Sequence, residues 1–86
     1  MIIRLQKIVP HKNQRRFYTL SVQPTLFGEW AFVREWGRIG NDGGKIATEY
    51  FPSESEALEA CEILRIQKSK RGYVVRPQQL GLPFWG

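Results

Sequence analysis

Apolar and polar residues alternate along the first half of the chain, and this period of two predicts short β-strands. Pro10 and Pro24 interrupt the alternation, and a glycine-rich stretch at 40–44 interrupts it again. Its Asn-Asp-Gly-Gly sequence supplies residues that tolerate the positive φ angles of a hairpin turn. Because the connections are short, we expect the strands to pair antiparallel. The expected strands cover residues 2–9, 15–23, 30–38 and 45–51.

After residue 52 the apolar period changes to that of a helix. Ser53 is a predicted N-cap, and Glu56 three positions later completes a capping box. Gly72 is the expected C-terminal stop, and residues 73–75 then return to the sheet edge. The helix has an apolar stripe suited to packing on a sheet. Its members are Ala57, Ala60, Cys61 and Leu64, with Leu58 at the border.

These elements predict an α+β fold, with a four- to five-stranded antiparallel sheet and one main helix packed on it. A chain of 86 residues accommodates one domain. We assign residues 1–76 to this domain and residues 77–86 to a C-terminal tail. The tail contains two prolines and is too short for a second domain, although it carries Leu80, Leu82, Phe84 and Trp85.

The single cysteine excludes an internal disulfide, which is typical of a reduced, intracellular protein. No apolar run approaches the roughly 18 residues of a membrane span, and the start lacks a signal-peptide pattern. We therefore expect a cytoplasmic protein without a membrane partner.

Charge is unevenly distributed along the chain, whose net charge is 13 − 8 = +5. Residues 1–48 carry a balance of +5, residues 49–64 of −5, and residues 65–86 of +5. A basic surface with aromatic residues set into it is the usual footprint of a nucleic-acid-binding protein. A surface kept soluble by its charge is the alternative interpretation.

The chemistry that catalysis requires is sparse. His11 is isolated in a polar loop, and Cys61 lies on the apolar helix stripe, which favours packing over reactivity. One cysteine and one histidine cannot assemble a zinc site. Residues 40–45 lack the spacing of a phosphate-binding loop and precede no helix. We expect no enzyme activity, no metal and no cofactor.

A binding constellation is better supported. Trp36 and Arg38 flank Gly37, and Arg34 falls on the same strand face as Trp36. An indole can stack on a base or sugar, and guanidinium groups bind phosphate through paired hydrogen bonds. From the residues alone, Trp36 as sheet packing and Trp36 as a ligand contact are alternative interpretations.

The run from Trp30 to Gly40 resembles the signature of WGR domains, which are named for its central Trp-Gly-Arg. Surrounding motifs in residues 1–76 agree in order with that family. They are Tyr18, Leu20 and Val22 before the run, a Gly-Gly-Lys turn at 43–45, Phe51-Pro52-Ser53 with Ala57, Lys68 to Lys70, and Gly72-Tyr73.

WGR domains occur in DNA-dependent poly(ADP-ribose) polymerases, where they bind DNA breaks, and in short bacterial proteins of this size. The resemblance implies that Trp36 packs against an exposed DNA terminus, that Arg38 bridges DNA and neighbouring domains, and that Gly37 leaves the path between them open. The resemblance also implies phosphate contacts at Lys45 and around Lys70 and Tyr73, and we add Arg34 as a candidate because it shares the strand face of Trp36. Zinc fingers, a regulatory helical domain and a transferase domain have no room in 86 residues.

The resulting hypothesis is a non-catalytic DNA-binding module that recognises ends or nicks through the Trp-Gly-Arg motif. The alternative is a protein-interaction adaptor that docks a partner domain through the same motif, since Arg38 can pair with a carboxylate as readily as with phosphate. A small hydrolase or nuclease is disfavoured by the shortage of catalytic groups. The sequence favours no oligomeric state.

Overall fold

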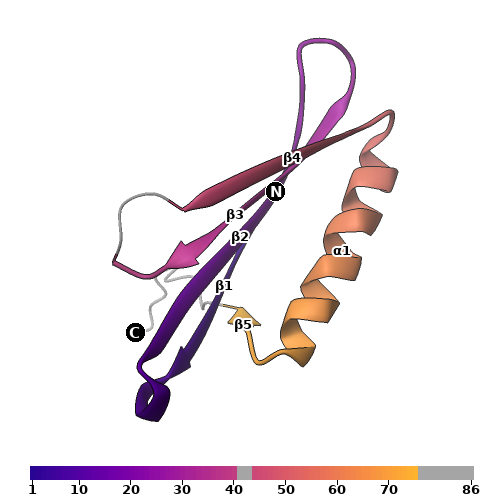
Figure 1. The fold of residues 1–86 in the computed structure, drawn as a ribbon. Helices are drawn as coiled ribbons and strands as arrows, with labels where there is room; N and C mark the ends of the chain where they lie inside the picture. The colour runs from indigo at the N-terminus through magenta and orange to yellow at the C-terminus, as the bar shows by residue number, and fades with distance from the viewer. Residues whose placement is uncertain (41–43, 76–86) are drawn as a thin grey trace, which may run out of the picture.

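A computed structural model describes residues 1–40 and 44–75, which form one antiparallel sheet with a helix along one side (Figure 1). The spatial order of the strands is β4-β3-β2-β1-β5. The predicted α+β architecture, with five strands and one main helix, is confirmed. The elements are β1 (Ile2–Val9), the 3-10 helix η1 (Pro10–Lys12), β2 (Gln14–Pro24), β3 (Trp30–Arg38), β4 (Lys45–Phe51), α1 (Glu54–Lys70) and β5 (Val74–Val75).

Two parts of the sequence prediction lie outside the described residues: the middle of the 40–44 turn and the 77–86 tail. The domain boundary at residue 76 therefore stays a prediction. Within residues 1–40 and 44–75, no helix has the length and apolar character needed to cross a membrane.

The strand register decides which side chains share a face of the sheet. Leu5 pairs with Tyr18, Tyr18 pairs with Trp36, and Trp36 pairs with Lys45. Directly paired residues point to the same side of an antiparallel sheet. These side chains therefore form a row across β1 to β4 on the side that α1 covers, which we call the helix face. We call the opposite side the open face.

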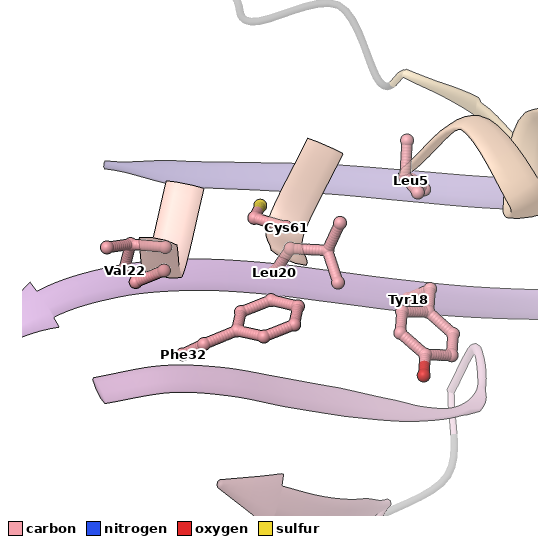
Figure 2. Close-up of a cluster of buried hydrophobic side chains, with 7 residues drawn as sticks. Leu5, Tyr18, Leu20, Val22, Phe32 and Cys61 are labelled. Atoms are coloured by element: carbon pink, nitrogen blue, oxygen red, sulfur yellow. The ribbon is translucent and has the colours of Figure 1, made fainter. Parts of the chain in front are cut away.

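The hydrophobic core lies between the helix face and α1 (Figure 2). Ala57 and Cys61 are buried one helical turn apart, and their small side chains let α1 lie close to the sheet. Burial raises the pKa of the Cys61 thiol, which favours the protonated, unreactive form, so the predicted packing role is confirmed. The buried cluster consists of Leu5, Tyr18, Leu20, Val22, Phe32, Ala57 and Cys61.

Helix α1 begins at the predicted cap. The Glu56 backbone N–H donates to Ser53 Oγ at 3.3 Å, and Ser53 Oγ donates to Glu56 Oε2 at 2.9 Å. Both contacts tie the first turn to the residue before it, where backbone N–H groups otherwise lack partners.

Substitution Ser53→Ala is expected to lower the free energy of unfolding by about 0.5–2 kcal/mol, because it removes the cap acceptor. Urea denaturation followed by circular dichroism measures this change. The matched control is Ser69→Ala, an exposed serine in the last turn of α1, far from the cap. Equal losses in the two variants would show that the cap contributes nothing specific.

The end of α1 directs the chain back to the sheet. Gly72 has φ +99°, a left-handed conformation that glycine adopts without strain, and it follows the C-cap residue Arg71. The Tyr73 backbone N–H donates to the Lys68 carbonyl at 3.1 Å. The chain then pairs with β1 through Val74 and Val75. This reversal places Tyr73 and Lys68 beside the end of the core that contains Tyr18.

Candidate nucleic-acid interface

Trp36 lies near the end of β3 on the helix face and is half-buried. Its ring stacks on that of Tyr18, with centroids 5.4 Å apart and planes 9° from parallel. On its other flank, Lys45 is the directly paired residue of β4. The two interpretations of Trp36 are therefore compatible, because the indole packs against Tyr18 and still keeps part of its surface exposed.

Tyr18 supports this stack from inside the protein. It is buried at the end of the core opposite Val22 (Figure 2), and it meets Tyr73 edge-on at a centroid distance of 6.1 Å. Burial raises the pKa of the Tyr18 hydroxyl, and the positive charge of Arg34 opposes the rise. A buried, doubly contacted ring holds the Trp36 indole in a fixed orientation.

Beyond the Trp36 row, the next row of the helix face contains three cations on β1, β2 and β3. Lys7 pairs with Arg16, and Arg16 pairs with Arg38, so three basic side chains lie side by side across β1, β2 and β3. We call these residues the basic row. It adjoins the end of α1, since a Cβ built on Gly72 would lie 3.3 Å from Lys7 Cε.

Cations from α1 and β3 extend this charge inward. Lys68 Nζ lies 4.5 Å from the ring centroid of Tyr18, within the range of a cation–π contact. Burial lowers the pKa of Lys68, and the charges of Arg71 and Arg34 lower it further. The Nε of Arg34 is buried and has no hydrogen-bond partner in the described part of the chain. Like charges thus gather here without compensation, which favours an anionic ligand.

Most of the described acidic residues lie away from the basic row, and the carboxylate on the helix face of the sheet, Glu49, is paired with Phe32. Among the described residues, the ion pair is between Glu62 and Arg65 on α1, and the basic row has no carboxylate partner. The remaining glutamates of α1 belong to its N-terminal half, whereas Lys68 lies in its last turn. The interface is therefore electropositive at one end of the sheet, where repulsion between its cations would be relieved by bound phosphate or carboxylate.

Unlike Trp36 and Arg38, which lie on the helix face, Gly37 occupies a strand position on the open side of the sheet. A Cβ there would lie 3.2 Å from Phe17 Cε1 and 3.1 Å from the Gly44 Cα. A Cβ on Gly44 would lie 2.5 Å from the Trp36 carbonyl oxygen, so this position also excludes a side chain. The two glycines let β3, Phe17 and the start of β4 pack closely beneath Trp36. The sequence predicts an open path beside Gly37, whereas the structure packs Phe17 and Gly44 against this position.

The structure brings most of the predicted site residues to one end of the molecule. The helix face contains Trp36, Arg38, Arg34 and Lys45. Tyr73 contacts Tyr18, which is on the same face. Lys70 is exposed near the end of α1 and borders a hollow of about 430 Å³. The other residues that line this hollow are Gln67, Lys68 and Arg71.

The site residues predicted from the sequence do not include Lys7, Arg16 or Tyr18, whereas Lys68 belongs to the predicted Lys68 to Lys70 motif. Lys7 alternates onto the same strand face as Ile3, Leu5 and Val9, and a cation in that apolar series is a sequence signal for a binding site. Among the described residues, no group of three or more His, Cys, Asp or Glu could hold a metal ion. The arrangement is suited to binding flat rings and anions.

Comparison with known proteins identifies the same family that the sequence motifs resemble. The family model of the WGR domain matches residues 1–79. The chain is also similar to the uncharacterized protein y4dW of Sinorhizobium fredii (strain NBRC 101917 / NGR234), with 38% identity over 73 residues. This match covers 85% of the chain and 35% of the relative, so the chain spans about a third of that protein's length. Family model, motif order and fold agree, and the chain belongs to the WGR domain family.

Proposed function

We propose that this chain is a non-catalytic DNA-binding module that recognises ends or nicks through Trp36 and the basic row. Membership of the family is consistent with a nucleic-acid-binding or interaction module. The observation that carries the DNA proposal is the Trp36–Tyr18 stack next to Lys7, Arg16 and Arg38. An aromatic ring beside uncompensated cations is suited to a nucleotide, which joins a flat base to a phosphate.

The geometry of the stack favours interrupted DNA. Tyr18 occupies one face of the Trp36 ring, which leaves the exposed remainder of the indole for the ligand. Inside a continuous duplex, each base pair is covered above and below by its neighbours. At an end or nick one base face or sugar can be exposed, and stacking on it is worth roughly 1–3 kcal/mol. Trp36 would thus add affinity at a break and little elsewhere.

The phosphates would be held by the cations around the indole. Arg38 and Arg16 present planar donor forks that suit phosphate oxygens, and Lys7 and Lys45 add point charges on either flank. Contacts of this kind are independent of base sequence, so we expect binding that responds to DNA structure and to salt.

The test compares a duplex carrying one 5′-phosphorylated nick with an unbroken closed dumbbell of the same sequence. Trp36→Ala is expected to lower affinity for the nicked duplex by roughly 5- to 150-fold, the equivalent of 1–3 kcal/mol, and to leave dumbbell binding nearly unchanged. Fluorescence anisotropy at two salt concentrations measures both affinities. Phe27→Ala is the matched control, because that aromatic side chain is 87% exposed in the β2–β3 connection, away from the basic row.

A folded Trp36→Ala variant is required for this comparison, since Trp36 packs against the core. Circular dichroism checks the fold, and Trp36→Phe, which keeps an aromatic ring, should recover part of the nick preference. An equal loss on both DNAs, or no loss, would contradict break recognition. If the wild type did not bind DNA at physiological salt but bound polyglutamate, the ligand of this surface would be better assigned as a carboxylate-bearing protein partner.

A further inference from the structure

The open face of the sheet lacks a covering element among the described residues. Figure 1 shows α1 on one side of the sheet only. Large apolar side chains on the opposite side are 43–65% exposed, although such residues are usually buried in a monomer. They are Ile2, Ile8, Ile46, Tyr50 and Val74. A face of this composition suits an interface.

The two charges in the central row of this face form a symmetric pattern, whereas Arg15 lies at the end of β2. Arg4 pairs with Thr19, and Thr19 pairs with Glu35, so the cation and the carboxylate flank β2 in one row. Two strand spacings separate them by about 9.6 Å, too far for an ion pair within the chain. Neither has an ion-pair partner in the described part of the chain.

The neighbouring row repeats this symmetry with apolar residues. Ile2 and Val33 flank Ser21 on β2, as Arg4 and Glu35 flank Thr19. Rotation of a second copy by 180° about an axis along β2 would therefore place each β1 side chain opposite a β3 side chain. Ile2 would meet Val33 of the second copy, and Arg4 would meet its Glu35.

We propose that the open face binds a second copy of this chain, forming a two-fold symmetric dimer whose axis runs along β2. Such a contact uses the same surface on both subunits, and two reciprocal Arg4–Glu35 pairs provide its charge complementarity. The strands of the two copies stay roughly aligned, as they do when twisted sheets stack face to face.

A second copy suits this face better than DNA does. Arg4 and Glu35 balance each other in the central row, and Glu35 would repel a phosphate backbone. Trp36 and the basic row lie on the helix face and stay exposed in the dimer. If the proposed DNA function holds, the dimer presents two DNA-binding faces on opposite sides and can hold two DNA ends together.

The test is sedimentation velocity of the full 86-residue chain without DNA, over a wide concentration range. The wild type is expected to dimerise. Arg4→Glu and Glu35→Arg should each weaken dimerisation by about tenfold or more, because each places like charges opposite one another. Glu49→Arg is the matched control: the same substitution at an exposed strand position whose pairing with Phe32 places it on the helix face.

Two complementary arms separate this arrangement from damage to the fold. A mixture of the two single variants should form a heterodimer, and the chain carrying both substitutions should dimerise with itself, because opposite charges then meet at both positions. A wild type that stays monomeric would overturn the proposal. This face would then be assigned to the 76–86 segment or to a different partner. A dimer insensitive to the single reversals would also overturn the proposal, as would a mixture and double variant that stay monomeric. The measurement contains no DNA, so its outcome is independent of the nick-binding result.

Discussion

Replacing Leu20 by alanine is expected to lower the free energy of unfolding by about 3–5 kcal/mol. Leu20 is 0% exposed and sits on β2, the middle strand of the sheet, between Phe32 and Cys61 (Figure 2). Truncation removes buried methyl groups and leaves a cavity that a rigid sheet and helix close only in part. Small domains have only about 5–15 kcal/mol of stability in total, so the loss would take up much of it.

Urea denaturation at several temperatures measures this loss, and the chain supplies a matched control. Leu26→Ala removes the same atoms from a side chain that is 99% exposed, so its effect should stay within about 0.5 kcal/mol. Similar values at the two positions would contradict the packing of α1 over β2, because an uncovered Leu20 would behave like Leu26.

The strands and the helix could be predicted from local patterns, because the spacing of apolar residues within one element indicates which side of that element is buried. Alternation distinguished Trp36 and Arg34 from Glu35, and the cap residue Ser53 fixed the helix start. The fold class then followed from short connections and from a single apolar helix stripe. These inferences depend on residues that are near one another in the sequence.

The composition of the site depends instead on strand register, which local patterns leave open. Arg16 and Arg38 become neighbours only because β2 and β3 pair with Tyr18 opposite Trp36. A shift by one residue would turn Arg16 and Tyr18 to the other face. The contribution of Lys68 likewise requires the path of α1 across the sheet, which brings its last turn over Tyr18.

Gly37 shows a second limit of local reasoning. Its neighbours in the motif suggested a functional role, whereas the structure shows that Phe17 and Gly44 fill the space where its side chain would be. Tight packing of this kind involves three separate segments of the chain. Because Trp36 lies next to Gly37, the motif combines a residue that supports the strand geometry with residues that face the proposed ligand.

Removing two members of the basic row is expected to change the salt dependence of DNA binding. Each phosphate contact contributes about 0.9 to the slope of log K against log salt, so Arg16→Ala with Arg38→Ala should reduce the magnitude of the slope by about 1.8. Affinity at low salt should fall by about 3 kcal/mol or more, since hydrogen bonds to charged groups contribute about 1.5–3 kcal/mol each. Titrations of the same nicked duplex at four or more salt concentrations measure both quantities.

Arg15→Ala is the control for this experiment, because Arg15 precedes Arg16 in β2 and is equally an exposed strand residue, but it points to the open face. It should leave the slope nearly unchanged, whereas a surface that binds only through net charge would respond to Arg15 and Arg16 alike. An affinity loss in the Arg16/Arg38 variant without a change in slope would mean that these guanidiniums do not neutralise phosphates. The basic row would then be better assigned to a carboxylate-bearing protein partner, and Trp36 to the packing of that interface.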